Sequence, residues 1–520
     1  MTDSRTDSET AAVVISGAGP NGLLLACELA LAGVRPVVLE RAPGPSGELK
    51  ANGLVGQIIR QLDMRGLYAA FSGASTPPEP SAGWIFAGMG LDFADLPENP
   101  MHVLPISQPE ITRLLAARAA DLGIDVRWGH ELLDVVPRAD GVAVRVAARG
   151  AEYHLDADWL VGADGGRSPV RKAAGIGFPG STTKMVARIA HVSLPDGMLG
   201  ADGSVDVPDF GRIPFGHNRF DTGGVMLFAR EPGRLMVGTM EFGQAPDGTP
   251  DEMSIGELRS SLRRVLGVDV PIAAPDYPGP HVMRRIAGQN TRQAERYRAG
   301  RILLVGDAAH VHSAMGGPGL NLGMQDVFNL GWKLAAVVDG RMPADLLDSY
   351  TAERFPVGER VMMHSRAQLA LMAPGPEVHS LRTLFGELIG SVDARSHLAG
   401  LLAGSDVRYD MGSGDHPLIG YMIPDLVLDD GRRVVELLRA GRPVLLDLAG
   451  EFTAPTDRVD VVRGRLTKTA PSRENLSGML IRPDGYVAWA ADGRDAPGLD
   501  AALRGWCGVE VSSASPARTP

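Results

Sequence analysis

The chain has 520 residues, of which 44% are apolar and 22% charged, and a chain of this length usually divides into two or three hydrophobic cores. This composition excludes a disordered or fibrous protein. The 51 basic and 62 acidic residues give a net charge of −11, and no cluster of basic residues occurs, which argues against nucleic acid or an anionic membrane as a partner. Two cysteines, a polar N-terminus and the absence of a long apolar run predict a cytoplasmic protein without a membrane span.

The first motif begins close to the N-terminus. A β-branched apolar run, 11–16, leads into the glycine loop Gly17-Ala-Gly-Pro-Asn-Gly22, and the apolar stretch 23–32 has the length and spacing of a buried helix. A second apolar run, 34–39, ends at Glu40. This order predicts a βαβ unit with a right-handed crossover and two parallel strands, as found in dinucleotide-binding sheets.

The glycine loop has the spacing of a pyrophosphate-binding turn. Gly17 permits the tight turn, Gly19 lets the backbone approach a phosphate, and Gly22 lets helix and strand pack closely. A phosphate would lie at the positive end of the helix. Glu40 follows Gly22 by 18 residues, where a carboxylate accepts hydrogen bonds from an adenosine ribose and repels a 2′-phosphate. The motif therefore predicts FAD or NAD at this site and disfavours NADP there.

The remaining pattern predicts that this cofactor domain is discontinuous. Helical and extended patterns continue it to about residue 174, and short alternating segments between turns then predict an inserted antiparallel sheet over 175–282. A buried strand at 301–306 and a helix at about 320–338 return to the first domain. Beyond a helical stretch that ends near Leu371, Pro/Gly-rich linkers lead to a small α/β tail from about residue 415.

Two later motifs distinguish between the cofactors. They are Trp159-Leu-Val-Gly-Ala-Asp-Gly-Gly-Arg-Ser-Pro-Val-Arg171 and Arg301-Ile-Leu-Leu-Val-Gly-Asp-Ala-Ala-His310. Together with the first loop they resemble the single-component FAD-dependent aromatic hydroxylases, the family of para-hydroxybenzoate hydroxylase, and its aromatic-polyketide oxygenase branch. The resemblance covers nearly the whole chain. With the patterns above it implies an α/β fold with a discontinuous Rossmann-type FAD-binding domain with long helices (11–174 and 283–400), an inserted antiparallel-sheet substrate domain (175–282) and a small thioredoxin-like C-terminal domain (415–512).

The resemblance also implies the residues that contact FAD. Asp307 would bind the ribityl chain, and Asp164 with Gly165 would lie near the pyrophosphate and take part in NAD(P)H use. The loop 316–321 opens a helix whose N-terminal amides would face the flavin and stabilise its reduced anion. Lys50 stands where the family usually has Arg, a residue of different geometry. The expected FAD-binding residues are Gly17, Gly19, Pro20, Asn21, Gly22, Glu40, Arg41, Lys50, Gln108, Asp164, Gly165, Gly306, Asp307, Gly319, Leu320 and Asn321, and the loop residues Gly316, Gly317, Pro318 and Gly319 would shape the reaction site.

The activity implied by the resemblance is that of a monooxygenase. NAD(P)H would reduce FAD, O2 would form a flavin C4a-hydroperoxide, and one oxygen atom would pass to an electron-rich ring. NADPH is the expected reductant, with NADH as the alternative. The expected substrate is a polycyclic aromatic polyketide of antibiotic biosynthesis, held between the inserted sheet and the flavin by apolar side chains. Candidates for that lining, although each is more typical of a sheet core, are Trp84, Phe86, Phe215, Phe228, Met240 and Met283.

Several alternatives stay open at this stage. Baeyer–Villiger oxygenation of a polyketide ketone would use the same oxygenated flavin, and the sequence does not separate it from hydroxylation. A flavin-fold binding protein without turnover would have no need of the loop at 316–321, and a flavin halogenase would carry a Trp-x-Trp-x-Ile-Pro segment that this chain lacks. The pair His310-x-His312 belongs to the flavin loop and has no further ligands at the spacing of a metal site, so no metal and no general base are predicted. A homodimer is compatible with the sequence.

Overall fold

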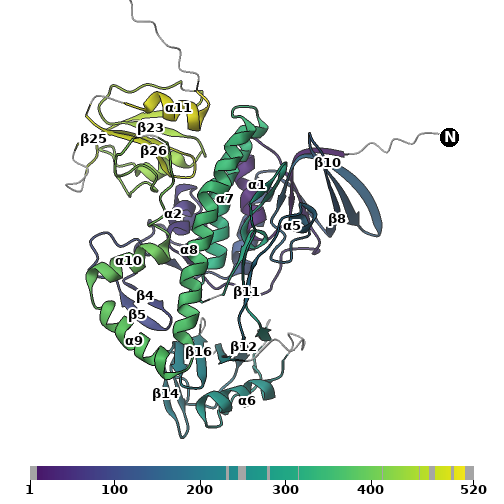
Figure 1. Cartoon of the computed structure of the whole chain (residues 1–520), viewed down its shortest axis with the longest axis vertical. Helices are drawn as coiled ribbons and strands as arrows, with labels where there is room; N and C mark the ends of the chain where they lie inside the picture. Colours follow the sequence, from purple (N-terminus) through teal and green to yellow (C-terminus); the bar gives the residue numbers. More distant parts are fainter. Residues whose placement is uncertain are drawn as a thin grey trace, which may run out of the picture.

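The computed structural model describes residues 9–229, 234–243, 253–277, 281–313, 315–412, 414–455, 457–467, 475–493 and 497–509. Figure 1 shows two long helices that run through the middle of the molecule, with an antiparallel sheet near one end and a small C-terminal unit at the other. The end of the expected C-terminal domain, residues 510–512, lies outside the described residues.

A mostly parallel sheet organises the N-terminal region. The parallel strands are ordered β21-β10-β1-β2-β7, and three antiparallel strands, β8, β9 and β20, extend the sheet. Val13, Val14 and Ile15 of the central strand are fully buried, as is typical of a parallel sheet whose faces are covered by other elements. The strands are β1 (Glu9–Ser16), β2 (Val37–Glu40), β7 (Asp125–Trp128), β8 (His130–Pro137), β9 (Val142–Ala148), β10 (Ala151–Gly162), β20 (Arg298–Ala299) and β21 (Ile302–Leu304).

The predicted βαβ unit is present, since β1 and β2 pair in parallel and α1 lies between them in the chain. The chain then leaves this sheet after β10 and returns at β21, about 140 residues later, in parallel pairing with β10. The helices of this region are α1 (Pro20–Leu31), α2 (Gln57–Met64), α3 (Tyr68–Ser72), α4 (Gln108–Asp121), α5 (Pro169–Ala173), α7 (Pro318–Val338) and α8 (Asp348–Met372), with the short 3-10 helices η1 (Gly306–Ala308) and η2 (Ala344–Leu347). Among the described residues, no helix is both long and apolar enough to cross a bilayer.

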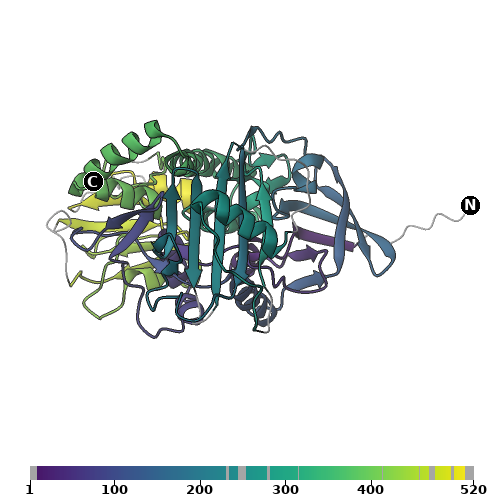
Figure 2. The ribbon, with the colours of Figure 1, turned by 90° about the horizontal axis from the view of Figure 1, so that it is seen from below.

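The inserted segment forms a five-stranded antiparallel sheet in the order β15-β16-β17-β12-β18. Helix α6 (Ile255–Leu266) packs its apolar face on one side of this sheet, and Figure 2 shows the helix lying across the strands. The strands are β12 (Met185–Val192), β15 (Gly216–Phe220), β16 (Gly223–Ala229), β17 (Leu235–Phe242) and β18 (Met283–Ala287). The expected boundary between 282 and 283 is therefore one strand too early, because residues 283–287 complete this sheet by pairing with β12.

Smaller sheets join these parts. Strands β11 (Gly180–Thr182), β19 (Asn290–Gln293) and β22 (His310–Val311) connect the inserted sheet to the first region. Two-stranded pairs are formed by β3 (Leu54–Val55) with β6 (Val103–Leu104), by β4 (Gly83–Phe86) with β5 (Met89–Asp92), and by β13 (Val205–Val207) with β14 (Gly211–Ile213).

The expected linker after residue 371 is wrong, because two helices occupy most of it. They are α9 (Pro376–Leu388) and α10 (Val392–Ala403). Phe385 of α9 stacks on Phe86 of β4 with ring centroids 5.3 Å apart, and Leu398 and Leu401 of α10 join the same apolar cluster. The segment therefore covers part of the molecule rather than spacing two domains.

The C-terminal unit is a small mixed sheet with a helix. Its order is β24-β23-β25-β26, where β23 is parallel to β24 and antiparallel to β25. The elements are η3 (Val434–Leu438), β23 (Val444–Asp447), β24 (Asp460–Arg463), β25 (Leu476–Ile481), β26 (Val487–Asp492) and α11 (Leu499–Cys507). Its core is continuous with that of the first region, so the unit is firmly docked.

Candidate cofactor site

Three distant sequence motifs meet at one edge of the parallel sheet. Ser16 at the end of β1 is in register with Leu39 of β2 and Gly162 of β10, and Gly162 is in register with Leu304 of β21. Glu40 ends β2, and Gly17, Asp164 and Asp307 lie just after the other strands, so the structure brings all four to the same edge. Ligands of open α/β sheets bind at this carboxyl edge.

The glycine loop leaves room where a phosphate group is expected. A Cβ atom on Gly17, whose φ is +106°, would lie 2.5 Å from the carbonyl oxygen of Ala163, and a Cβ on Gly22 would lie 1.9 Å from that of Gly17. A Cβ on Gly19 would meet no atom within 4 Å. Gly19 is the N-cap of α1, and no side chain caps the helix there. Two glycines thus allow close packing of the chain, whereas the third borders open space at a positive helix end.

Glu40 and Asn21 hold this loop in place. The Glu40 carboxylate accepts hydrogen bonds from the backbone N–H groups of Ala18 and Ala42, each at 2.9 Å. Both oxygens keep a further lone pair, so an additional hydrogen bond from a ribose hydroxyl is compatible with this geometry. Asn21 packs against the motif at Gly306, since a Cβ on Gly306 would lie 2.0 Å from the Nδ2 atom of Asn21. Its buried Oδ1 atom has no hydrogen-bond partner among the described residues.

Asp164 carries a second orphaned acceptor. One carboxylate oxygen accepts a hydrogen bond from the Val170 N–H at 3.1 Å, while the buried Oδ1 atom has no partner among the described residues. Burial raises the pKa of this carboxyl, against the effect of hydrogen bonds from Ser168 and the backbone. A buried acceptor without a donor is costly, and a bound hydroxyl-bearing ligand would satisfy it. Gly165 follows with a φ of +81°.

Asp307 lies in the short helix η1 and reaches solvent. The pKa of its carboxyl is nevertheless raised, because protein surrounds it on most sides, and the charges of His310 and Lys50 only partly oppose this. Asp307 is therefore a solvent-accessible carboxylate with protein on most sides. Lys50 forms an ion pair with Glu48 at 2.9 Å, and Glu48 also contacts Arg284 of β18 at 3.0 Å. These contacts hold the loop that carries Lys50 against the inserted sheet.

The N-terminus of α7 faces the same region. Its N-cap Gly317 has a φ of +68°, Pro318 occupies the first turn, and no side chain caps the helix. Asn321 donates from Nδ2 to the Gly317 carbonyl at 2.7 Å and accepts from the Val55 N–H at 2.9 Å, so its side chain fixes the loop. The amides of Gly319 and Leu320 are left free of a capping side chain.

His312 is a site residue that was not nominated from the sequence. A Cβ on Gly319 would lie 3.5 Å from its ring, and its Nε2 atom is buried without a partner in the described part of the chain. Burial lowers the pKa of this imidazole to about 4, so the ring is neutral at neutral pH. The paired His310-x-His312 spacing was the available signal. Arg41 is exposed after β2, and the Gln108 N–H donates to the Ala51 carbonyl at 3.0 Å, which ties α4 to the neighbouring loop.

An apolar cluster lies beside this edge, between the antiparallel sheet, the β4–β5 hairpin and helices α8 to α10. Its buried members include the flexible side chains of Met185, Met226, Met240, Met315 and Met372. Met315 comes from the loop before α7, so the cluster reaches the expected flavin side. His217 stands opposite Met226 on the same sheet face, and its buried Nδ1 atom has no partner among the described residues.

Four of the six expected lining residues lie in or against this cluster. Phe86 and Met240 are buried members, and Trp84 and Phe228 pack at its border. The other two do not line its interior. Phe215 is 51% exposed and forms a T-shaped pair with Phe228, and Met283 packs against the apolar cluster between the antiparallel sheet and α6.

Taken together, the free helix N-termini, the open space at Gly19 and the orphaned acceptors fit a dinucleotide with a long polyhydroxyl chain, such as FAD. The fold and site define a flavin-dependent oxidoreductase. Residues 10–365 match the FAD binding domain family, and residues 416–509 match the family described as aromatic-ring hydroxylase, C-terminal. The chain belongs to the FAD-dependent aromatic-ring hydroxylases and is a monooxygenase of that type.

Similar proteins cover almost the whole chain. A 12-dehydrotetracycline 5-monooxygenase/anhydrotetracycline 6-monooxygenase of Streptomyces rimosus subsp. rimosus is 39% identical over 510 residues, which are 95% of this chain and 98% of the relative. The structure of an anhydrotetracycline hydroxylase from Streptomyces rimosus superposes with a TM-score of 0.84 at 37% identity, over 96% and 100% of the two chains. The structure of an aklavinone-11 hydroxylase with FAD and aklavinone gives a TM-score of 0.71 at 26% identity, over 96% and 100%.

Proposed function

We propose that this protein is an NAD(P)H-using monooxygenase that hydroxylates a polycyclic aromatic polyketide. The observation that carries the proposal is that the methionine-rich cluster reaches the start of α7, through Met315 of the preceding loop and through Val55, whose N–H donates to Asn321 at 2.9 Å. FAD, when bound, supplies the activation of O2 and the transfer of one oxygen atom. The oxygenating mechanism implied by the sequence resemblance is part of this proposal.

The chain's own residues would bind and orient the reactants. The start of α1 and the open space at Gly19 would receive the pyrophosphate, and Glu40 the adenosine ribose. Asp307 would accept hydrogen bonds from the ribityl hydroxyls, and the amides at the start of α7 would stabilise negative charge at the flavin. The methionines of the cluster can repack around a flat polycycle, and α9 and α10, which already cover part of the cluster, would exclude water.

Product structure tests this function. The purified holoenzyme would be given NADPH or NADH and a panel of polycyclic phenols and quinones, and the products characterised by mass spectrometry and NMR. A product with one added oxygen and an intact carbon ring is expected. A ring-expanded lactone would instead establish Baeyer–Villiger oxygenation, and the absence of any oxygenated product with every compound would contradict the proposal within this substrate class.

Replacement of Asp307 by Ala is expected to weaken FAD binding about ten- to a hundredfold, because hydrogen bonds to a charged acceptor contribute about 1.5–3 kcal/mol. The dissociation constant can be measured by quenching of FAD fluorescence on titration with apoprotein. Half-buried Asp156 of β10, whose carboxylate pairs with Arg138 at 2.8 Å, is a suitable control position, and its Ala variant should bind FAD normally. Unchanged affinity of the Asp307 variant would refute the role given to this carboxylate.

NAD(P)H oxidation is expected to accelerate severalfold when a polycyclic substrate is present. Oxidation without substrate would waste reductant on O2, so a response to substrate is expected. The loop before α7 suits such gating, because Gly316 and Gly317 have φ of +79° and +68°, a conformation that other residues rarely adopt. Lys50, in place of the family's usual Arg, is expected to leave a measurable background rate. Stopped-flow measurement with and without substrate decides the point, and equal rates would exclude this form of gating.

A further inference from the structure

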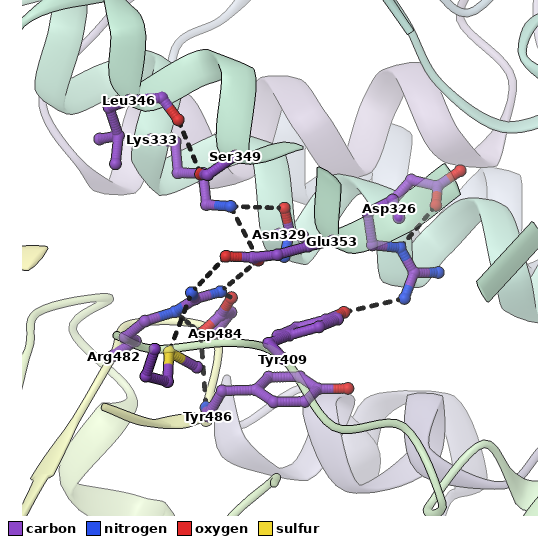
Figure 3. Close-up of polar contacts among 12 residues, drawn as sticks. Asp326, Asn329, Lys333, Leu346, Ser349, Glu353, Tyr409, Arg482, Asp484 and Tyr486 are labelled. Carbon is purple, nitrogen blue, oxygen red and sulfur yellow. Dashed lines mark hydrogen bonds and ion pairs between the residues drawn. The ribbon is translucent and has the colours of Figure 1, made fainter. Parts of the chain in front are cut away.

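Buried contacts connect the cofactor edge with the C-terminal unit, and Figure 3 shows those around Asp326, Tyr409, Glu353 and Arg482. The contacts begin at Asp326, a fully buried residue of α7. Its Oδ2 atom lies 2.6 Å from His310 Nε2 and accepts a hydrogen bond from the Gly306 N–H at 3.3 Å. Gly306 and His310 lie on either side of Asp307 in the sequence. The Asp326 carboxylate therefore contacts both ends of the turn that contains Asp307.

The contacts also keep the Asp326 carboxylate ionised. Burial opposes ionisation of Asp326, but His310 and Arg354 outweigh it and hold the pKa of the carboxyl below its usual range. Arg354 donates from Nε to the second oxygen at 2.8 Å. Oδ2 is then an anionic acceptor for a proton on His310 Nε2, and this contact fixes the orientation of the ring.

Arg354 carries the chain of contacts toward the C-terminal unit. Its Nη1 group donates to the hydroxyl of Tyr409 at 3.0 Å, and its Nη2 group donates to the Leu322 carbonyl at 3.2 Å. The Tyr409 ring stacks on Tyr486 with centroids 4.2 Å apart. Tyr409 belongs to the segment that leads into the C-terminal unit, and Tyr486 to the turn between β25 and β26. Docking of this unit thus determines the position of the Tyr409 hydroxyl.

A neighbouring contact anchors the same turn on α8. Glu353, adjacent to Arg354, accepts hydrogen bonds from Arg482 at 2.7 and 2.8 Å and from Lys333 Nζ at 2.8 Å. Consecutive residues of one helix therefore hold the C-terminal unit and the cofactor turn. The three cations and three anions of this group balance in charge, and all six are buried: Lys333, Arg354 and Arg482 with Asp326, Glu353 and Asp484.

We propose that Asp326 is a positioning residue for FAD because it holds the turn that bears Asp307. The docked C-terminal unit, through Tyr409 and Arg354, sets how firmly Asp326 holds this turn. The inference rests on the proposed contact between Asp307 and FAD. It gives the C-terminal unit a role in cofactor affinity, although its contacts lie on the far side of α7 and α8 from the expected flavin. A purely structural cluster would stabilise the fold without changing FAD affinity of the folded protein.

Tyr409→Phe is the sharpest variant, because it removes one hydroxyl and keeps the stacked ring. Its FAD dissociation constant, measured on folded apoprotein, is expected to rise about three- to tenfold, the range for loss of one buried hydrogen bond. Ser477→Ala is the matched control, since Ser477 donates to the Ala491 carbonyl at 2.7 Å inside the C-terminal sheet. The control should lower the unfolding temperature and leave FAD affinity unchanged.

A double-mutant cycle shows whether the effect passes through Asp307. In an Asp307→Ala background, Tyr409→Phe is expected to cause no further loss of FAD affinity. Wild-type affinity of Tyr409→Phe, or an equal loss in both backgrounds, would overturn the inference. Wild-type affinity of Asp307→Ala alone would instead overturn the placement of FAD. Arg354→Lys, which keeps the charge but loses the forked geometry, gives a second test with the same expected weakening should Tyr409→Phe not fold.

Discussion

Gly19→Ala is expected to leave a stable apoprotein that no longer binds FAD tightly, whereas Gly22→Ala is expected to prevent the cofactor domain from folding. A Cβ on Gly19 meets nothing within 4 Å, and its φ of −71° suits any residue. The same atom on Gly22 would lie 1.9 Å from a backbone oxygen, which forces α1 away from β1 at a cost of about 3 kcal/mol or more.

The contrast separates cofactor contact from chain packing. A methyl group at Gly19 would occupy the space proposed for the pyrophosphate, and a loss of affinity of about a hundredfold, or about 2.7 kcal/mol, is expected. Thermal unfolding of the apoprotein and FAD fluorescence titration measure the two effects independently. Normal FAD binding by Gly19→Ala would mean that the pyrophosphate lies elsewhere.

Glu353→Gln is expected to destabilise the protein by about 3–5 kcal/mol, because it leaves Lys333 buried without a counter-charge and leaves Arg482 with Asp484 as its remaining acidic partner. Urea unfolding followed by circular dichroism would measure the loss. The double variant Glu353→Gln/Lys333→Met should recover part of it, since one unpaired cation is then removed as well. A double variant less stable than the single variant would show that the charge balance is not what stabilises this contact.

The same pair predicts how stability depends on pH. Burial disfavours the Glu353 anion, but Arg482 and Lys333 outweigh it and lower the pKa of this carboxyl from 4.5 to about 2. A carboxyl with a depressed folded-state pKa stabilises the protein fully above its unfolded value, and this contribution is lost as the pH falls from about 4.5 toward 2. Glu353→Gln should lack this component of acid destabilisation.

Lys333 acts in the opposite direction at high pH. Burial lowers the pKa of its amine from 10.5 to about 8 in spite of Glu353, so the unfolded chain binds this proton more tightly than the folded one. The desolvation cost of the charged amine is therefore relieved as the pH rises from about 8 to 10.5. Comparison of the wild type with Lys333→Met over this range isolates the contribution.

Local patterns were sufficient to predict the parts of the fold that depend on neighbouring residues. The β1–loop–α1–β2 unit follows from an apolar run, a glycine loop and a buried helix in order. The position of Asp164 and Asp307 was implied by the family resemblance, and the parallel pairing of the strands before them explains why they lie at one edge. The long helix α7 was predicted within two residues at its start.

Most parts of the fold that the sequence did not predict depend on contacts between residues far apart in the chain. Helix α9 is a different kind of miss, because Leu381, Leu384, Phe385 and Leu388 recur at helical spacing and the linker prediction overlooked this local signal. Strand β18 has half-buried residues throughout and lacks the alternation that marks a strand. Arg482 and Glu353 are 129 residues apart, and opposite charges at such a separation do not reveal their pairing.

The departure of the chain after β10 and its return at β21 also constrain biosynthesis. Residues 160–162 of β10 pair with residues 302–304, so this side of β10 has no strand partner until about 140 further residues have been made. At translation rates of about 5–20 residues per second, the nascent chain waits roughly 7–28 seconds in this condition. An unpaired apolar strand is a template for aggregation, and pairing across so long a separation is slow. The yield in a foreign host is therefore expected to depend on the availability of chaperones during synthesis more than on the stability of the finished enzyme.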